Sequence, residues 1–152
     1  MTEELVKSFT SSPFGDSVNL DEIYENFEFL DDWEERYSYI IDLGKQLPSF
    51  PEEHKIEDNY VHGCQSQVWL IHHYDAESKK LYLLIESDAI IVKGLAAVVL
   101  TILNKKTASE VAEFDVEAVF EKLDLIRHIS PTRGNGLRSM IDKIKKVAQT
   151  IS

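Results

Sequence analysis

The sequence contains a single cysteine among 152 residues, and this scarcity excludes several kinds of chemistry. One cysteine cannot form an internal disulfide, and a dithiol oxidoreductase would lack its resolving cysteine. Zinc and iron–sulfur sites need several soft ligands, which one cysteine and five scattered histidines do not supply. His72 and His73 are adjacent, so on a strand they would point to opposite faces and could not chelate together. We therefore expect no metal site.

Basic residues are also few. The chain has 16 Lys and Arg against 27 Asp and Glu, which gives a formal net charge of −11. Nucleic acids are bound through basic surfaces, so a field of this sign argues against a nucleic-acid partner. The acidity favours solubility, or attraction to a protein partner that carries a basic patch.

Long hydrophobic segments are lacking as well. The longest apolar stretch, residues 89–103, is interrupted by Lys93 and Gly94, whereas a membrane span needs about 20 apolar residues. We interpret it as a buried core helix and expect no membrane association. No N-terminal basic region is followed by an apolar core, as a secretion signal would require. Together with the lone thiol, this predicts a reducing, cytoplasmic location.

The composition is that of one globular domain, with 43% hydrophobic and 28% charged residues. Residues 1–18 contain Ser, Pro and Gly and lack a sustained apolar pattern. They are therefore predicted to form a flexible tail, with a short helix at about residues 4–9. The folded domain is predicted to span residues 19–152.

Helical periodicity and capping residues predict several helices in this domain. The signals, in chain order, are the stripe Ile23, Phe27 and Leu30 after Asn19; the box-like pair Asp31 and Glu34, with Gly44 and Pro48 as stops; the run 89–103 with Ser87 and Asp88 as caps; the capping-box pair Thr107 and Glu110; the cap Asp115; and the stripe from Leu137 to Ala148.

Two strands are predicted between these helices, over residues 66–74 and 80–86. The polar link 75–79 is short enough for an antiparallel hairpin. Pro131 and residues 134–136 (GNG) predict a loop before the last helix. The fold class is therefore α+β, one domain with a small, mainly antiparallel β-sheet packed against several α-helices.

Cys64 lies between Gly63 and the strand-like run 68–71, where a sharp turn is expected to enter the sheet. A loop tip suits a thiol that must meet another molecule. The alternative is that Cys64 is a small buried hydrophobic residue, the commoner fate of free cysteine. Trp69, in the following strand, is predicted to pack in the core.

Two kinds of chemistry remain open for one thiol. A cysteine hydrolase would need a histidine base, for which His62 or His128 is available, although no oxyanion hole or nucleophile elbow is visible. A carrier would instead accept a group covalently on Cys64 and hand it on to a partner. A sulfur atom suits such a carrier, because attack of a thiolate on a persulfide resembles thiol–disulfide exchange.

Four segments carry a more specific signal: residues 33–37 (WEERY) with 43–48 (LGKQLP), residues 63–69 (GCQSQVW), residues 87–95 (SDAIIVKGL), and residues 130–133 (SPTR) with Gly136 and Leu137. In order and spacing they resemble the SufE/CsdE family of sulfur-acceptor proteins in iron–sulfur cluster assembly. The resemblance covers nearly the whole chain from about residue 20. Thr132 departs from the serine often found in the family, and residues 1–18 are longer than the family core requires.

The resemblance implies that Cys64 accepts persulfide sulfur from a cysteine desulfurase of the SufS/CsdA type, which carries pyridoxal phosphate. Members of the family stimulate that partner and pass sulfur towards a cluster scaffold such as SufBCD. They hold no cofactor of their own, and their α+β fold is shared with IscU-type scaffolds. A further possibility is a regulatory subunit that binds the desulfurase without carrying sulfur.

Five residues are expected to support Cys64. Gly63 would allow the loop to hinge, and Gln65 and Ser66 would shape the docking loop. Asp88 would organise the partner surface or, as an alternative, cap the following helix. Arg133 would bind a carboxylate or hold a persulfide anion, or else form an exposed salt bridge. We also expect Cys64 to be shielded in an apolar pocket between loop and sheet until a partner docks and the loop swings outward.

Overall fold

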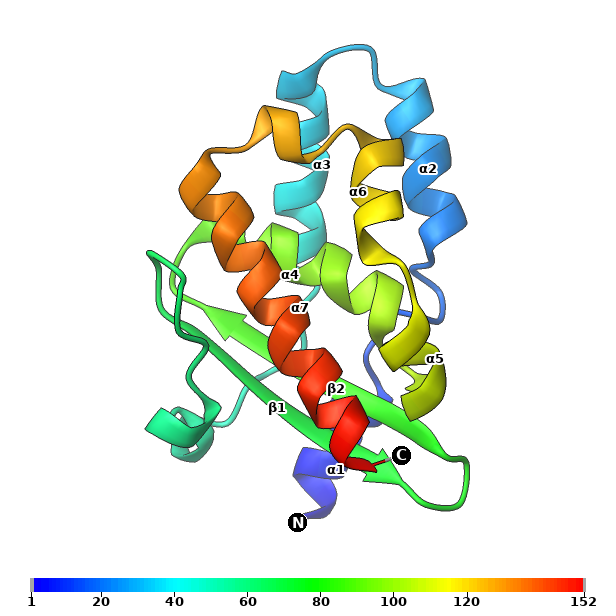
Figure 1. The fold of residues 1–152 in the computed structure, drawn as a ribbon, viewed down its shortest axis with the longest axis vertical. Coiled ribbons are helices and arrows are strands. Elements are labelled where there is room, and N and C mark those ends of the chain that lie inside the picture. Colours follow the sequence, from blue (N-terminus) through cyan, green and yellow to red (C-terminus); the bar gives the residue numbers. More distant parts are fainter. Residues whose placement is uncertain (1, 152) are drawn as a thin grey trace.

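The computed structural model describes residues 2–151, and its architecture is α+β as predicted. A three-stranded antiparallel sheet in the order β1-β2-β3 lies against α4, and α4 is covered in turn by α3 and α7 (Figure 1). The helices of the described residues are α1 (Glu3–Thr10), α2 (Leu20–Phe29), α3 (Trp33–Gly44), α4 (Ile90–Leu103), α5 (Ala108–Glu113), α6 (Val116–Leu123) and α7 (Pro131–Ile151), with short 3-10 turns at Glu52–His54, Glu57–Asn59 and Ile126–His128.

The predicted hairpin is confirmed. β1 (Val68–Asp75) pairs with β2 (Lys80–Ser87) in an unbroken register from Val68 opposite Ser87 to Asp75 opposite Lys80. β3 (Lys106–Thr107) adds a two-residue edge to β2 that the sequence did not predict. It is too short to show the alternation by which strands are recognised.

The sheet is buried on both faces, because its side chains alternate between two apolar clusters. Val68, Leu70, Leu81, Leu83 and Ile85 join the main core with α4. Ile71 and Leu84 point to the other face, where Trp69 and Tyr82 pack beside them and are partly buried. Trp69 therefore belongs to the rim of this second cluster rather than to the main core.

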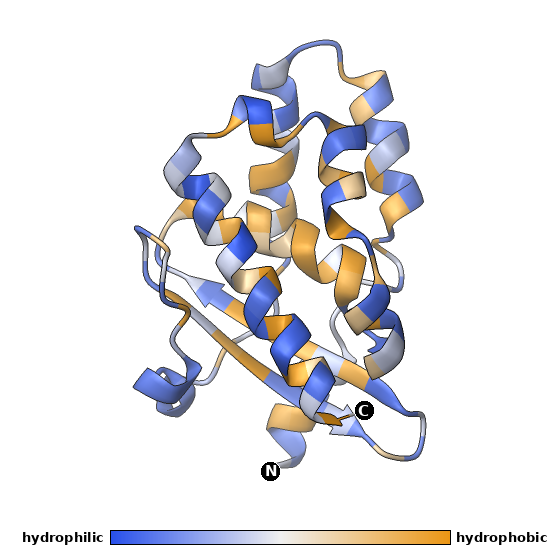
Figure 2. Cartoon of the chain, viewed as in Figure 1, coloured by the Kyte–Doolittle hydropathy of each residue, from blue (hydrophilic) through white to orange (hydrophobic). Residues whose placement is uncertain are grey.

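The run 89–103 forms the central helix, as predicted. Every residue of α4 from Gly94 to Leu103 is buried. Figure 2 shows it as an almost continuously apolar segment between the sheet and α7. No described helix is long and apolar enough to cross a membrane.

Two of the predicted caps are confirmed, because Asp115 caps α6, and Thr107 and Glu110 form a capping box at α5. Asn19, where helix signals were expected to begin, caps α2. The box predicted from Asp31 is displaced by one residue, because Asp32 accepts the hydrogen bond from the Glu35 backbone N–H. Neighbouring aspartates offer equivalent acceptors, so the sequence alone could not choose between them.

The structure corrects the flexible tail predicted for residues 1–18, of which residue 1 lies outside the described residues. Residues 3–10 form α1, and Phe9 and Phe14 are fully buried. Phe9 joins the apolar cluster on the second face of the sheet. Asn104 and Lys105 then hold the segment by donating hydrogen bonds to the carbonyls of Phe14 and Ser12, at 3.0 and 2.7 Å. The physical reason is that the hairpin exposes an apolar second face, which α1 covers.

We predict that Phe9→Ala lowers the free energy of unfolding by about 3 kcal/mol, the usual loss when a buried phenylalanine is truncated. The measurement is urea unfolding of the full chain. Lys7→Ala, on the exposed side of the same helix, is the matched control and should change stability by less than about 0.5 kcal/mol. Equal, small effects of both variants would show that α1 contributes no packing energy.

Candidate functional site

Cys64 lies in a loop whose two ends are joined to each other. The Val61 backbone N–H donates to the Val68 carbonyl at 2.8 Å, and Tyr60 forms a bridge with Trp69. Gly63 has a φ of +93°, in the left-handed region that favours glycine. The turn that was predicted at Gly63 is therefore present, and it directs the chain into β1.

Two side chains from elsewhere hold the base of this loop. Lys143 of α7 donates from Nζ to the carbonyls of Asp58 and Tyr60, at 3.1 and 3.0 Å. The Asp88 carboxylate accepts from the Gln67 backbone N–H at 3.0 Å. The loop is thus fixed just before residue 61 and again at residue 67.

The alternative role of Asp88 as a helix cap is wrong. Ala89 occupies the N-cap position of α4 and makes no side-chain capping bond. Asp88 is one residue too early in the chain, and its carboxylate turns towards the loop instead. It therefore braces the cysteine loop, and this contact was not visible from local sequence.

The thiol of Cys64 is partly buried over a cavity of about 60 Å³. The cavity is lined by Cys64, Gln65 and Ser66 of the loop, Val92 and Leu95 of α4, and Thr132, Arg133, Gly136, Leu137 and Met140 of α7. A single water needs roughly 10–15 Å³ by such a measure, so the space exceeds what one added atom requires. We name it the Cys64 cavity.

Shielding of Cys64 was predicted, but its location is different. The apolar side chains over the thiol come from α4 and α7 and not from the sheet. Burial raises the pKa of the Cys64 thiol, and Sγ donates a weak hydrogen bond to the Gly136 carbonyl at 3.5 Å. The resting thiol is therefore protonated at neutral pH and poorly nucleophilic.

The predicted loop at residues 134–136 is wrong, because these residues lie in α7. The sequence therefore did not indicate that one helix supplies five of the residues that line the cavity. α7 begins at Pro131, where proline is favoured, and the Ser130 hydroxyl accepts from the Arg133 backbone N–H at 3.2 Å. This start overrides the turn signal of Gly134 and Gly136. Arg133 is consequently an exposed residue in the first turn of a helix, and it is among the residues that line the Cys64 cavity.

Of the predicted supporting residues, Gln65, Ser66 and Arg133 line the cavity, while Gly63 and Asp88 shape and brace the loop. Sequence reasoning missed Val92, Leu95, Thr132, Gly136, Leu137 and Met140 as cavity residues. The pairs Val92–Leu95 and Leu137–Met140 each stand three apart, a spacing that marks one face of a helix. Nothing in that spacing indicates that the two faces meet at a thiol.

Neither candidate histidine approaches the thiol. His62 is exposed and contacts Glu57 at 2.7 Å, while His128 contacts Asp124 at 3.3 Å and stacks on Trp33. Within the described residues, neither lines the cavity or hydrogen-bonds to Cys64. A cysteine hydrolase needs its base within hydrogen-bond reach, so this arrangement does not support that alternative.

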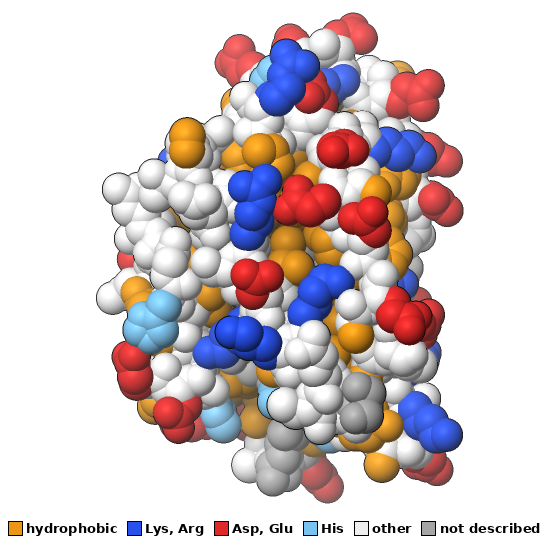
Figure 3. All heavy atoms as spheres, viewed as in Figure 1, with side chains coloured by type: hydrophobic (Ala, Val, Ile, Leu, Met, Phe, Trp, Pro, Cys, Tyr) orange, Lys and Arg blue, Asp and Glu red, His pale blue; other side chains and the backbone are white. Residues whose placement is uncertain are grey.

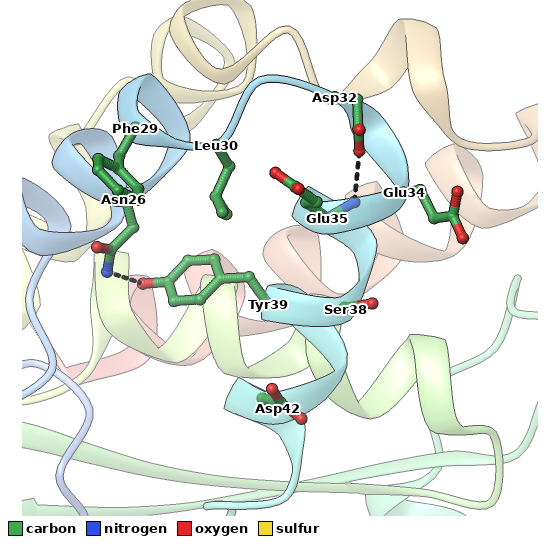
Figure 4. Close-up of a pocket in the computed structure, with 9 residues that line it drawn as sticks. All are labelled: Asn26, Phe29, Leu30, Asp32, Glu34, Glu35, Ser38, Tyr39 and Asp42. Atoms are coloured by element: carbon green, nitrogen blue, oxygen red, sulfur yellow. Dashed lines mark hydrogen bonds between the residues drawn. The ribbon is translucent and has the colours of Figure 1, made fainter.

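A wider hollow of about 660 Å³ lies between α2 and α3 and shares no lining residue with the Cys64 cavity. Figure 4 shows Asn26 donating to the Tyr39 hydroxyl and Asp32 capping the first turn of α3. Its other charged residues are Glu34, Glu35 and Asp42. Figure 3 shows further acidic side chains along the upper and right-hand edges of the molecule. None of the residues that line this hollow carries a thiol.

Among residues 2–151, no three His, Cys, Asp or Glu side chains gather as a metal site would require.

The fold and the site define a small α+β protein with one shielded thiol on a braced loop. The family described as SufE, the Fe-S metabolism associated domain, matches residues 21–148, and the chain belongs to this family. Its role therefore lies in iron–sulfur metabolism.

Two relatives agree with this assignment, and one solved structure agrees with the fold. A SufE-like protein of Rhizobium meliloti is 51% identical over 134 residues, covering 87% of this chain and 96% of that protein. A SufE-like protein of Rhizobium etli is 46% identical over 134 residues, with coverages of 87% and 90%. The solution structure of a hypothetical protein from Thermus thermophilus has the same fold, with a TM-score of 0.70 at 20% identity, and covers 86% of this chain and 93% of its own.

We predict that Asp88→Ala frees the loop and accelerates alkylation of Cys64 by iodoacetamide about tenfold, because it removes the acceptor that holds Gln67. Asp88→Asn retains an acceptor oxygen and should react close to the wild-type rate. Rates in urea, where every variant is unfolded, provide the reference. An unchanged rate in Asp88→Ala would show that the brace does not restrain the thiol.

The pKa of Cys64 also gives a pH prediction. The folded state holds the thiol proton more tightly than the unfolded chain, whose cysteine titrates near about 8.5. The stability that this difference contributes is present below the unfolded pKa and is lost as the pH rises through the higher folded pKa. The wild type should therefore lose stability relative to Cys64→Ser above about pH 8.5. Parallel pH profiles of urea unfolding for the two proteins would contradict a raised pKa.

Proposed function

We propose that this protein is a sulfur acceptor and carrier in iron–sulfur cluster assembly. In this proposal Cys64 takes persulfide sulfur from a cysteine desulfurase of the SufS/CsdA type, stimulates that enzyme and passes the sulfur towards a scaffold such as SufBCD. The observation that carries the proposal is the position of the sole thiol: a loop with fixed ends holds it over a preformed cavity, with no histidine base within reach among the described residues. Membership of the SufE family supports it.

The transfer step is a displacement at sulfur. The Cys64 thiolate attacks the outer sulfur of the desulfurase persulfide, a new S–S bond forms at Cys64, and the old S–S bond breaks to release the desulfurase cysteine as a thiolate. The proton of the Cys64 thiol passes to solvent or to the released thiolate. No electrons are gained or lost overall. Because the sulfur comes from one partner and passes to another, we propose an accessory transfer protein and not a stand-alone enzyme.

Shielding explains why the Cys64 thiol of the carrier is unreactive until its partner docks. The buried thiol is protonated, and leaving the cavity would return its pKa towards the ordinary value and increase the thiolate fraction. The loop can move outward about its fixed ends at Tyr60 and Gln67, and Gly63 accommodates the change of direction. Docking of the desulfurase therefore both exposes and activates the nucleophile.

Arg133 supplies positive charge for the product. It is the only charged residue among the described residues that line the cavity. A persulfide is a stronger acid than a thiol and is anionic at neutral pH, so a guanidinium beside it is favourable. We propose that Arg133 stabilises the loaded form of Cys64.

The remaining chemistry belongs to the partners. The desulfurase holds pyridoxal phosphate, and this chain needs no cofactor for the displacement. A thiol that must stay reduced between turnovers requires a reducing compartment, and the cytoplasm provides one. The net charge of −11 favours protein partners with basic surfaces over nucleic acid.

The test is the intact mass of this protein after incubation with a SufS-type desulfurase and free cysteine. We expect a gain of one or more sulfur atoms that a reductant reverses, and no gain in Cys64→Ser. Sulfide release by the desulfurase should rise with the wild type and not with Cys64→Ser. If an active desulfurase adds no sulfur and Cys64→Ser still stimulates it, the protein is a regulatory subunit and the carrier role is excluded.

A further inference from the structure

Cys64 fits against α7 because residue 136 has no side chain. A Cβ atom placed on Gly136 would lie 3.1 Å from Cys64 Sγ and 3.5 Å from both its Cα and its Cβ. The distance to Sγ is shorter than van der Waals contact, whereas the other two are ordinary contacts. The Gly136 carbonyl also accepts the thiol hydrogen bond at 3.5 Å. The inward position of the thiol therefore depends on this one glycine.

The same helix contains a second glycine without this relation to the thiol. A Cβ on Gly134 would meet only the Ile126 side chain, at 4.0 Å, which is ordinary contact. Both glycines are buried within α7, where alanine would be the better helix former. Position 134 thus has room for alanine, while position 136 has room only if Cys64 moves.

The hydrogen bonds from Lys143 and to Asp88 act at the base of the loop. Lys143 holds the carbonyls of Asp58 and Tyr60, and Asp88 holds the backbone of Gln67. These bonds end on backbone atoms of the loop base, whereas Cys64 Sγ bonds to the Gly136 carbonyl. The base contacts fix where the loop is attached, and the contact of Sγ with Gly136 fixes which way its tip points.

We propose that Gly136 is a positioning residue that sets the balance between inward and outward positions of the Cys64 loop. It thereby sets how accessible the Cys64 thiol is in the resting protein. An added methyl group at 136 favours the outward position, because its Cβ would lie 3.1 Å from Sγ and the thiol would have to shift by a few tenths of an ångström to relieve the contact. For the consequence on sulfur uptake, this inference rests on the proposed sulfur-acceptor function. The effect on the thiol itself does not.

The first test compares Gly136→Ala with Gly134→Ala by alkylation of Cys64 with iodoacetamide. We expect Gly136→Ala to react about tenfold faster than the wild type, the factor that a modest overpacking penalty gives. The pH midpoint of its reaction should fall towards that of the unfolded chain. Gly134→Ala should match the wild type in both rate and midpoint. Equal rates and midpoints for all three proteins would overturn the proposal.

A double-mutant cycle keeps the proposal testable even where Gly136→Ala is poorly stable. Cys64→Ala removes Sγ and leaves only the contacts of 3.5 Å. In that background Gly136→Ala should raise the unfolding midpoint, because alanine favours the helix. In the Cys64 background the gain should be smaller or reversed. The difference measures the coupling between the two sites, and additive effects would overturn the proposal.

Sulfur uptake is measured last, by intact mass against increasing concentrations of a SufS-type desulfurase. A larger outward population should lower the half-saturating concentration of the desulfurase for Gly136→Ala and leave Gly134→Ala unchanged. An unchanged half-saturating concentration, with faster alkylation, would remove the link to uptake. If the wild type gains no sulfur while Gly136→Ala alkylates faster, the proposed function fails and the positioning role of Gly136 stands.

Discussion

The structure depends on the burial of α4 between the β1–β2 hairpin and the helices α3 and α7. Residues 94–103 of this helix are all buried, so no face of it tolerates water and every neighbouring element is placed against it. The sheet cannot cover α4 alone, and α7 closes the remaining side. That closure brings the first turns of α7 beside the start of α4, where Val92 and Leu95 meet Leu137 and Met140.

The Cys64 cavity is a consequence of this packing. Where α4 and α7 meet near their first turns, apolar side chains leave a small space, and the loop before β1 lies over it with its thiol inward. Hydrogen bonds from Lys143 and to Asp88 fix the loop at both ends without filling the space. A rigid core and a braced loop base together leave only a short tip of chain free to move, which limits the conformational entropy lost when a partner binds.

Burial and reactivity oppose each other at this thiol. Burial raises the pKa of Cys64 and protects a lone thiol from oxidation and stray reaction, yet the same burial keeps it from a partner. A carrier must keep its thiol buried between transfers and expose it when a partner docks. The wider acidic hollow between α2 and α3 is separate from this site and adds no residue to it. The reacting group is therefore controlled by position, through contacts with α7, and not by a neighbouring catalytic base.

The sequence by itself determined the α+β class, the hairpin, the buried central helix and the choice of Cys64, because these depend on local periodicity, capping residues and the presence of one thiol. It predicted the short helix near residues 4–9 but not the burial of Phe9 and Phe14. It also failed at the cap role of Asp88 and at residues 134–136, where distant contacts override local preference. Phe9 packs because a sheet face needs a cover, Asp88 turns to a loop 21 positions earlier in the chain, and Gly136 lies inside a helix beside a thiol 72 positions away. Only the tertiary structure could decide these, since close approach between distant segments leaves no periodic trace in the sequence.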